Sequence, residues 1–178
     1  MELKQYQQVV LNDLAQYIAI LKEQGSNHKA FSTYWKQNGI TLQQGEETFH
    51  PYCDTMNGAP NMTIKVPTAG GKTFIACNAI RTIFDAMPVN RTKVVAWFVP
   101  SDTILKQTYE NLKNPQHPYR QRIDTLFNGR VEVYDKQALL FGQNFNPTII
   151  KEQLSIFVLS IQSFATKATD KRLVYNEN

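Results

Sequence analysis

Glycines, a lysine and a threonine stand together in residues 66–73, which have the sequence Val-Pro-Thr-Ala-Gly-Gly-Lys-Thr. Because glycine has no Cβ, its backbone N–H groups can approach a phosphate chain at close range. A lysine ammonium can reach the β- and γ-phosphates of a nucleotide, and a threonine hydroxyl can hold Mg²⁺. The segment therefore predicts a nucleotide site, with Lys72 on the phosphates and Thr73 on the metal.

The segment matches the phosphate-binding pattern G-x-x-x-x-G-K-[ST] except at its first position, where Val66 stands in place of glycine. The alternative is an ordinary glycine-containing turn with an exposed lysine. The flanking residues favour the nucleotide site, because residues 63–66 are typical of a short strand and residues 73–87 have helical spacing. A phosphate loop needs this order of strand, loop and helix, since the head of the helix adds its positive end.

Strands and helices alternate along the rest of the chain, and this predicts an open α/β sheet that is mostly parallel. The apolar run at residues 94–99 is typical of a strand buried on both faces. Residues 27–60 are rich in turn formers and predict an irregular insertion, with one short helical piece around Phe31, Tyr34 and Trp35. We expect helices over 3–23, 73–87, 102–113, 120–127 and 149–153, strands over 63–66, 93–99, 130–134 and 154–161, and domain limits of 1–26, 27–60 and 61–178.

Composition sets outer limits on the class of protein. The chain has 178 residues, of which 42% are hydrophobic, which is enough for one core. Its net charge of +4 is compatible with a nucleic-acid partner. It has no apolar run of roughly 18 residues and no signal-peptide core, so we predict a cytoplasmic protein without a membrane partner. Cys53 and Cys77 lack the paired spacing of a zinc site. One disulfide is the alternative, and free buried thiols are expected.

Residues 67–73 resemble motif I of superfamily-two helicases and translocases. They are most similar to the Pro-Thr-Gly-Gly-Gly-Lys-Thr form in the restriction subunit of type III restriction enzymes and related DEAD/DEAH-type proteins. The chain departs from that form at Ala69, where a Cβ requires an acceptable backbone conformation. The resemblance implies a RecA-like P-loop NTPase lobe, incomplete at its C-terminus, and an ATP hydrolase that uses ATP and Mg²⁺. The residues that it implies for the nucleotide are Thr68, Ala69, Gly70, Gly71, Lys72, Thr73 and Phe74.

A second segment, residues 3–7, resembles the aromatic-glutamine motif that precedes motif I in many such motors. The resemblance implies that Gln7 reads the adenine edge, with Tyr6 beside it, because a side-chain amide offers both a donor and an acceptor. The alternative is a solvated glutamine in a glutamine-rich helix. The presence of motif I downstream favours the nucleotide role.

Two further segments resemble the family's nucleic-acid contacts. Residues 98–101 resemble motif Ia, which implies that Pro100 and Ser101 meet the nucleic-acid backbone. Capping of the next helix by Ser101 is the alternative, and both can hold. Residues 158–164 resemble the segment before the Walker B strand, which implies contacts from Ser160, Gln162 or Ser163. The alternative there is a plain strand end and turn.

The Asp-Glu pair with which this family holds Mg²⁺ and orients water is not found after residue 164. We therefore expect the N-terminal part of a longer motor, which binds nucleotide weakly and does not hydrolyse it. An incomplete sheet would also expose a strand edge, so we expect self-association.

Three functions compete on this sequence. The first is the ATP-binding part of a DNA-dependent ATPase of the translocase type, with DNA favoured over RNA and a DNA-methyltransferase (modification) subunit as a partner. The second is a stand-alone nucleotide- or nucleic-acid-binding module without catalysis. The third is another P-loop enzyme, such as a small-molecule kinase, against which the segments around Gln7 and Pro100 argue. Lys106, Lys113, Arg120 and Arg122 form either a basic face or, as we favour, a solvated helix face.

Overall fold

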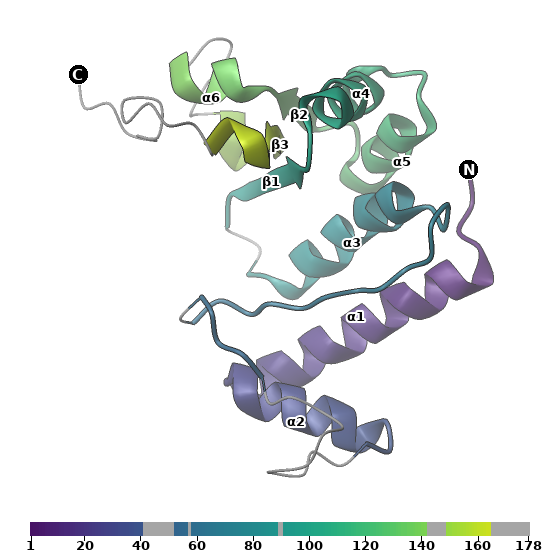
Figure 1. Ribbon diagram of the computed structural model, residues 1–178, viewed down its shortest axis with the longest axis vertical. Coiled ribbons are helices and arrows are strands. Elements are labelled where there is room, and N and C mark those ends of the chain that lie inside the picture. The colour runs from purple at the N-terminus through teal and green to yellow at the C-terminus, as the bar shows by residue number, and fades with distance from the viewer. Residues whose placement is uncertain (41–51, 57, 89–90, 142–148, 165–178) are drawn as a thin grey trace. The chain divides into compact units, whose positions relative to one another are not determined.

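The computed structural model describes residues 1–40, 52–56, 58–88, 91–141 and 149–164. The chain divides into two compact units, Glu2–Met87 and Pro88–Asn178, which we call the N-terminal unit and the C-terminal unit (Figure 1). The finer limits expected from the sequence, at residues 26 and 60, stay a prediction. None of the helices in the described ranges is long and apolar enough to cross a membrane.

The N-terminal unit is helical, and helix α1 (Gln5–Gln24) lies at its centre (Figure 1). Gly25 ends α1 in the left-handed conformation, where its N–H donates to the carbonyl oxygen of Leu21. The second helix, α2 (Asn27–Gln37), packs on α1 through a buried cluster that includes Tyr17 and Ala30. The short helical piece expected around Phe31, Tyr34 and Trp35 is therefore confirmed as α2, from which Phe31 and Tyr34 pack on α1.

The third helix, α3 (Lys72–Ala86), packs on α1 nearer to its N-terminus than α2 does. Leu11 of α1, Ile75 of α3 and Val66 form one buried cluster. The strand expected at residues 63–66 is not present, and residues 60–67 belong to no helix or strand. A β-type run needs a partner strand, and in the described residues no ladder forms beside it. Val66 alone of the four enters the core, whereas Ile64 is 43% exposed.

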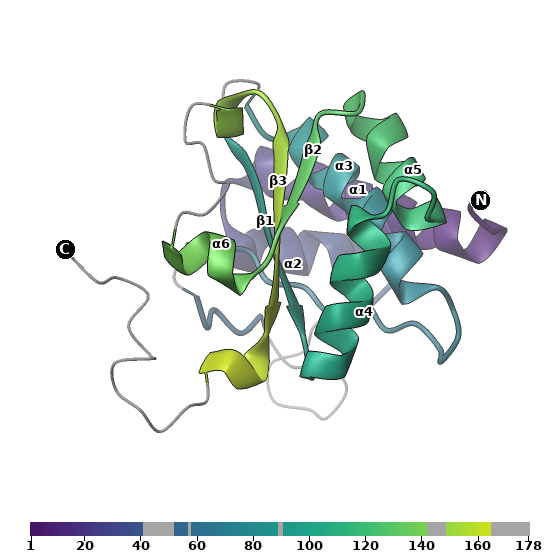
Figure 2. The ribbon, with the colours of Figure 1, turned by 90° about the horizontal axis from the view of Figure 1, so that it is seen from above.

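The C-terminal unit contains a three-stranded parallel sheet in the order β1-β3-β2, with β3 between its two neighbours (Figure 2). Helices α4 and α5 lie on one side of the sheet and α6 on the other (Figure 2). The strands and the longer helices expected here are confirmed, whereas α6 was not foreseen. The elements are β1 (Lys93–Val99), α4 (Asp102–Lys113), α5 (Pro118–Phe127), β2 (Val131–Tyr134), α6 (Lys136–Phe141), η1 (Ile149–Lys151), β3 (Leu154–Ser160) and η2 (Ile161–Phe164).

Burial differs between two strands of similar composition. All seven residues of β3 are buried, as expected of a central strand. In β1, buried or half-buried residues alternate with exposed ones, and Val94 and Phe98 are 47% and 51% exposed. The expectation that β1 is buried on both faces is wrong, because the exposed residues alternate along the strand and so belong to one face, which the described residues leave uncovered.

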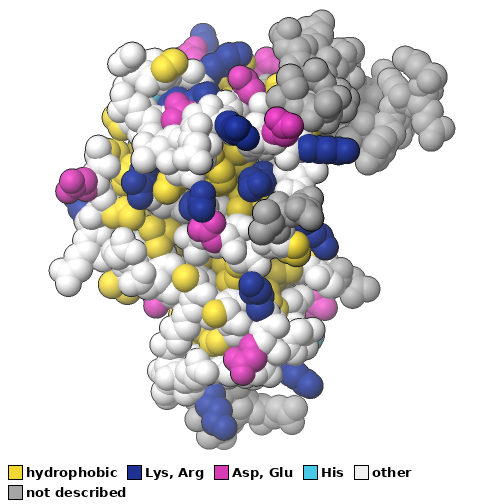
Figure 3. Space-filling view, turned by 180° about the vertical axis from the view of Figure 1, so that it is seen from behind, with side chains coloured by type: hydrophobic (Ala, Val, Ile, Leu, Met, Phe, Trp, Pro, Cys, Tyr) yellow, Lys and Arg dark blue, Asp and Glu magenta, His cyan; other side chains and the backbone are white. Residues whose placement is uncertain are grey.

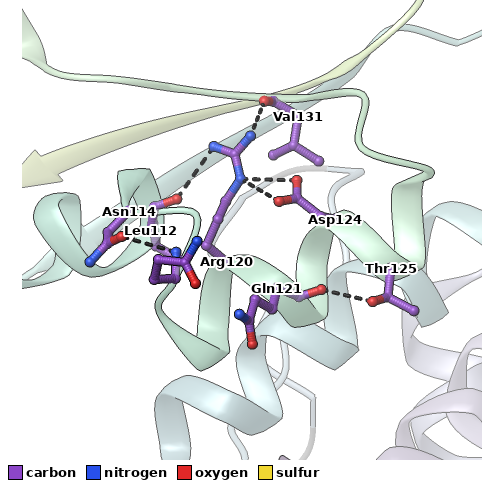
Figure 4. Close-up of polar contacts among 8 residues, drawn as sticks. Leu112, Asn114, Arg120, Gln121, Asp124, Thr125 and Val131 are labelled. Atoms are coloured by element: carbon purple, nitrogen blue, oxygen red, sulfur yellow. Dashed lines mark hydrogen bonds and ion pairs between the residues drawn. The ribbon is translucent and has the colours of Figure 1, made fainter.

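Arg120 joins three elements of the C-terminal unit (Figure 4). Its Nε lies 2.9 Å from both carboxylate oxygens of Asp124, one helical turn away on α5. Its Nη2 donates to the carbonyl oxygen of Val131 at 2.8 Å, and its Nη1 lies 3.5 Å from that of Leu112. The expectation of a solvated basic face is therefore wrong for Arg120, which links α5 to the end of α4 and to β2.

Candidate nucleotide site and nucleic-acid edge

The phosphate loop forms a tight turn directly before α3. The N–H of Gly70 donates to the carbonyl oxygen of Pro67 at 3.0 Å, which closes the turn. Two residues of the loop have left-handed backbone, Ala69 with φ of 61° and Gly71 with φ of 70°. This conformation costs a residue with a Cβ about 1–2 kcal/mol. The departure from the family's glycine at position 69 therefore has a visible conformational cost.

Lys72 is the first residue of α3, and its side chain folds back over the loop. Its Nζ donates to the carbonyl oxygen of Pro67 at 3.0 Å and is exposed to solvent. Gly71 is the N-cap of α3 and has no side chain to accept from the first amides, and the first turn contains no acidic residue. The positive end of the helix is thus not neutralised by a cap, which favours an anion at this position.

The other residues expected at the nucleotide differ in what they can present to it. Thr73 follows Lys72 in the first turn of α3 and is half-buried, whereas Thr68 and Ala69 are exposed. The side chain of Phe74 is fully buried, so only its backbone can face a ligand. Burial raises the pKa of the Cys77 thiol on α3 to about 12, so this thiol is a neutral core group and not a nucleophile.

Tyr6 and Gln7 at the start of α1 contact the loop directly. The Tyr6 hydroxyl donates to the carbonyl oxygen of Gly70 at 2.8 Å, and Gln7 Nε2 donates to the same oxygen at 3.2 Å. Gln7 Oε1 in turn accepts from the N–H of Lys4 at 3.0 Å. The structure thus brings the aromatic-glutamine motif and motif I together, but both ends of the Gln7 amide are engaged within the protein.

The residues expected at the nucleic acid directly follow the carboxyl ends of two strands in the C-terminal unit. Val99 at the end of β1 is in register with Ser160 at the end of β3. Because the two strands are parallel, residues 100–101 and η2 both begin at the same end of the sheet, the carboxyl ends of β1 and β3. Pro100 and Gln162 are exposed there, and Ser163 lies in η2.

Two serines at this end of the sheet are less available than the sequence indicated. The Ser101 hydroxyl accepts from the N–H of Ile104 at 3.4 Å, so Ser101 caps α4, as its alternative reading predicted. Ser160 is completely buried, and in the described residues its hydroxyl has no hydrogen-bond partner. A direct contact from Ser160 to a nucleic acid would therefore require the end of β3 to open. On the face in Figure 3, Lys and Arg side chains are spread among Asp and Glu.

Sequence reasoning found the loop but missed what touches it. The Tyr6 hydroxyl on the Gly70 carbonyl and the Pro67 carbonyl under Lys72 were not foreseen. The second contact is local and follows from the turn at residues 67–70. The first joins residues 64 positions apart. The resemblance at residues 3–7 placed Tyr6 at the same site but gave it a nucleotide as its partner and not the loop.

A tight turn with left-handed residues, followed by a lysine and a threonine at the head of a helix, is shared with P-loops, whereas the strand that precedes the loop in that class is not present in the described residues. The parallel sheet flanked by helices is the architecture of a RecA-like α/β lobe. The family model for the type III restriction enzyme, res subunit, matches residues 1–178, and the chain belongs to this family. At the level of the family it is a helicase-like ATPase module. No curated protein and no solved structure gives a match.

Proposed function

We propose that this chain binds the triphosphate of Mg-ATP at residues 67–73 and forms the ATP-binding part of a DNA-dependent ATPase of the translocase type. The observation that supports this is the convergence of one cation and one helix head on a single turn. Lys72 lies over the loop, α3 begins without a capping side chain, and the turn is closed by the Gly70–Pro67 hydrogen bond.

Each group has a separate task in this proposal. The Lys72 ammonium exchanges the neutral Pro67 carbonyl for phosphate oxygens, which form stronger charge-assisted hydrogen bonds. The first amides of α3, including that of Phe74, face the phosphates. The Thr73 hydroxyl holds Mg²⁺ on the same side. Thr68 and Ala69 border the phosphates from the opposite end of the loop.

The loop proposal is tested by titrating Mg-ATP into the wild type, Lys72→Ala and Lys29→Ala. Lys29 is an exposed lysine on α2, so its removal matches the change in net charge. We expect Lys72→Ala to weaken binding by more than about tenfold, the effect of losing a charge-assisted contact, and Lys29→Ala to change it little. Equal binding by all three proteins would exclude the loop as the nucleotide site.

Catalysis is tested on the same material by measuring phosphate release. We expect no Lys72-dependent hydrolysis by this chain alone, because no Asp-Glu pair follows the last strand. Hydrolysis that disappears in Lys72→Ala would contradict that expectation. If DNA binds and Mg-ATP does not, the stand-alone nucleic-acid-binding module becomes the better description.

We propose that DNA binds at the carboxyl ends of β1 and β3, where Pro100, Ser101, Gln162 and Ser163 lie. Gln162→Ala removes an exposed hydrogen-bonding side chain from this end of the sheet, and Gln137→Ala removes one from α6 as a control. We expect only Gln162→Ala to weaken binding of duplex DNA, and we expect duplex RNA to bind less well to the wild type. The same loss in both variants would remove these strand ends from the proposal.

Membership of the family further supports a modification subunit with DNA-methyltransferase activity as the partner of the complete protein. Co-purification of the two subunits, each expressed at full length, tests this partnership. We also propose the cytoplasm as the compartment, which localisation of a tagged full-length protein would test.

A further inference from the structure

The carbonyl oxygen of Gly70 is held by two side chains from the start of α1. A carbonyl oxygen has two lone pairs, and here the Tyr6 hydroxyl and Gln7 Nε2 occupy both, at 2.8 Å and 3.2 Å. We call these two side chains the carbonyl clamp. Both donors belong to the same unit as the loop, and they lie 64 and 63 positions before Gly70.

Holding this oxygen fixes the direction of an amide that the loop needs. The peptide bond between Gly70 and Gly71 is planar and trans, so its N–H points opposite to its C=O. With the carbonyl turned toward α1, the N–H of Gly71 is turned away from α1. The clamp thus sets the orientation of one of the loop amides that would face a phosphate chain.

Both glycines of the loop are closely packed, Gly71 against the clamp and Gly70 against its own turn. A Cβ on Gly71 would lie 2.5 Å from Gln7 Nε2, and the φ of +70° at this position is itself unfavourable for other residues. A Cβ on Gly70 would lie 2.6 Å from Cγ1 of Val66 and 2.9 Å from the carbonyl oxygen of Pro67. The loop is therefore packed between α1 on one side and its own turn on the other.

Gln7 is itself held in place. Its Oε1 accepts from the N–H of Lys4, as the third residue of a helix does in a capping box, and the residue is only 4% exposed. The amide therefore does not present a free donor and acceptor to a base in this structure. Tyr6, which is 41% exposed, has its hydroxyl directed at the loop.

We propose that Tyr6 and Gln7 are positioning residues of the phosphate loop and do not select the base. This inference rests on the proposed nucleotide site. It assigns to the hydroxyl of Tyr6 an effect on every ligand that carries the phosphate chain. A ligand without any base therefore loses as much affinity as ATP does when that hydroxyl is removed.

The test compares Mg-ATP, Mg-GTP and magnesium tripolyphosphate on the wild type, Tyr6→Phe and Tyr34→Phe. Tyr6→Phe deletes one hydroxyl and keeps the ring, and Tyr34→Phe deletes a hydroxyl on α2 of the same unit. We expect Tyr6→Phe to weaken all three ligands by the same factor, about three- to tenfold for one hydrogen bond, and Tyr34→Phe to weaken none. A loss for ATP with unchanged tripolyphosphate binding would overturn the proposal in favour of base reading, and so would no loss for any ligand.

A ligand-free measurement separates this proposal from the proposed function. Amide hydrogen exchange, followed residue by residue with NMR, reports how firmly the loop is held before any nucleotide is added. We expect Tyr6→Phe to speed exchange at the N–H of Gly70, whose hydrogen bond to the Pro67 carbonyl closes the loop, and Tyr34→Phe to leave it unchanged. If the wild type binds none of the three ligands, the nucleotide site fails, and equal exchange in all three proteins refutes the clamp by itself.

Discussion

Replacement of Arg120 by alanine removes the group that joins α5 to its neighbours in the C-terminal unit. The variant lacks the guanidinium, and with it the short contact to both oxygens of Asp124 and the 2.8 Å hydrogen bond to the carbonyl oxygen of Val131. The 3.5 Å contact to Leu112 is too long to contribute much. Asp124 would then keep its charge beside α4 and β2 without its partner.

The size of the effect follows from burial. Removing one partner of a fully buried ion pair costs about 3–5 kcal/mol. The side chains of Arg120 and Asp124 are 15% and 30% exposed, so solvent screens part of that cost. We therefore expect Arg120→Ala to lower the free energy of unfolding by about 2–3 kcal/mol, in the range between buried and exposed pairs.

The chain offers a matched control in helix α3. Arg81 and Asp85 form a pair with the same residue types, the same spacing and an Nε–Oδ1 distance of 2.8 Å, but their side chains are 45% and 56% exposed. We expect Arg81→Ala to cost about 0.5 kcal/mol, as exposed pairs on helices do. The two pairs share their spacing and distance, and they differ in burial and in the hydrogen bond that Arg120 also donates to Val131.

The two tryptophans allow each unit to be followed separately in urea. Trp35 lies on α2 and Trp97 on β1, so a Trp35→Phe background reports the C-terminal unit and a Trp97→Phe background the N-terminal unit. Arg120→Ala is measured in the first background and Arg81→Ala in the second. Equal losses of about 0.5 kcal/mol in both would refute the argument from burial. Arg120→Lys keeps the charge but not the fork of donors, and we expect it to recover less than half of the loss.

Three further predictions concern backbone strain, a buried thiol and a strand edge. Ala69→Gly should raise the free energy of unfolding of the N-terminal unit by about 0.5–1 kcal/mol in the Trp97→Phe background, because glycine adopts the left-handed backbone without strain; a loss of stability would count against this. Burial raises the pKa of Cys77 from 9.0 to about 12, so the folded state should lose stability as the pH rises from about 9 toward 12. At pH 8 a thiol reagent should modify the exposed Cys53 alone, and rapid modification of both thiols would contradict the burial of Cys77. The exposed edge strand β1, with Val94 and Phe98, should make light scattering grow with concentration, whereas a monomer at every concentration would contradict it.

The sequence predicted the strands of the C-terminal unit well and their burial only in part. Residues 94–99 and β3 have similar apolar runs, and both were expected to form strands. Burial depends on which faces of a strand other elements cover, which composition does not encode. β3 is buried on both faces, whereas one face of β1, with Val94 and Phe98, is exposed among the described residues.

The same reasoning explains the missing strand before the loop. Residues 63–66 have the composition of a strand, but a strand exists only as part of a ladder with another segment. Helices need no such partner, because their hydrogen bonds are local. The sequence therefore located α1 and α3 to within about two residues, the usual uncertainty of helix ends, and failed at the one strand expected in the N-terminal unit, where the described residues offer it no partner.

In the candidate site too, the sequence predicted the local contacts better than the distant ones. The loop is a local pattern, and its turn, its lysine and the head of its helix lie where the sequence indicates. The sequence pattern does not reveal that the Lys72 ammonium donates to a neutral carbonyl oxygen, that of Pro67. In the proposed nucleotide complex, a phosphate would displace only that carbonyl, so it would keep most of the gain from a charge-assisted bond. Had a carboxylate held the Lys72 ammonium instead, the same phosphate would have had to break an ion pair of similar strength. Within the part of the chain that the structure describes, the loop is thus organised without a salt bridge that would compete for its cation.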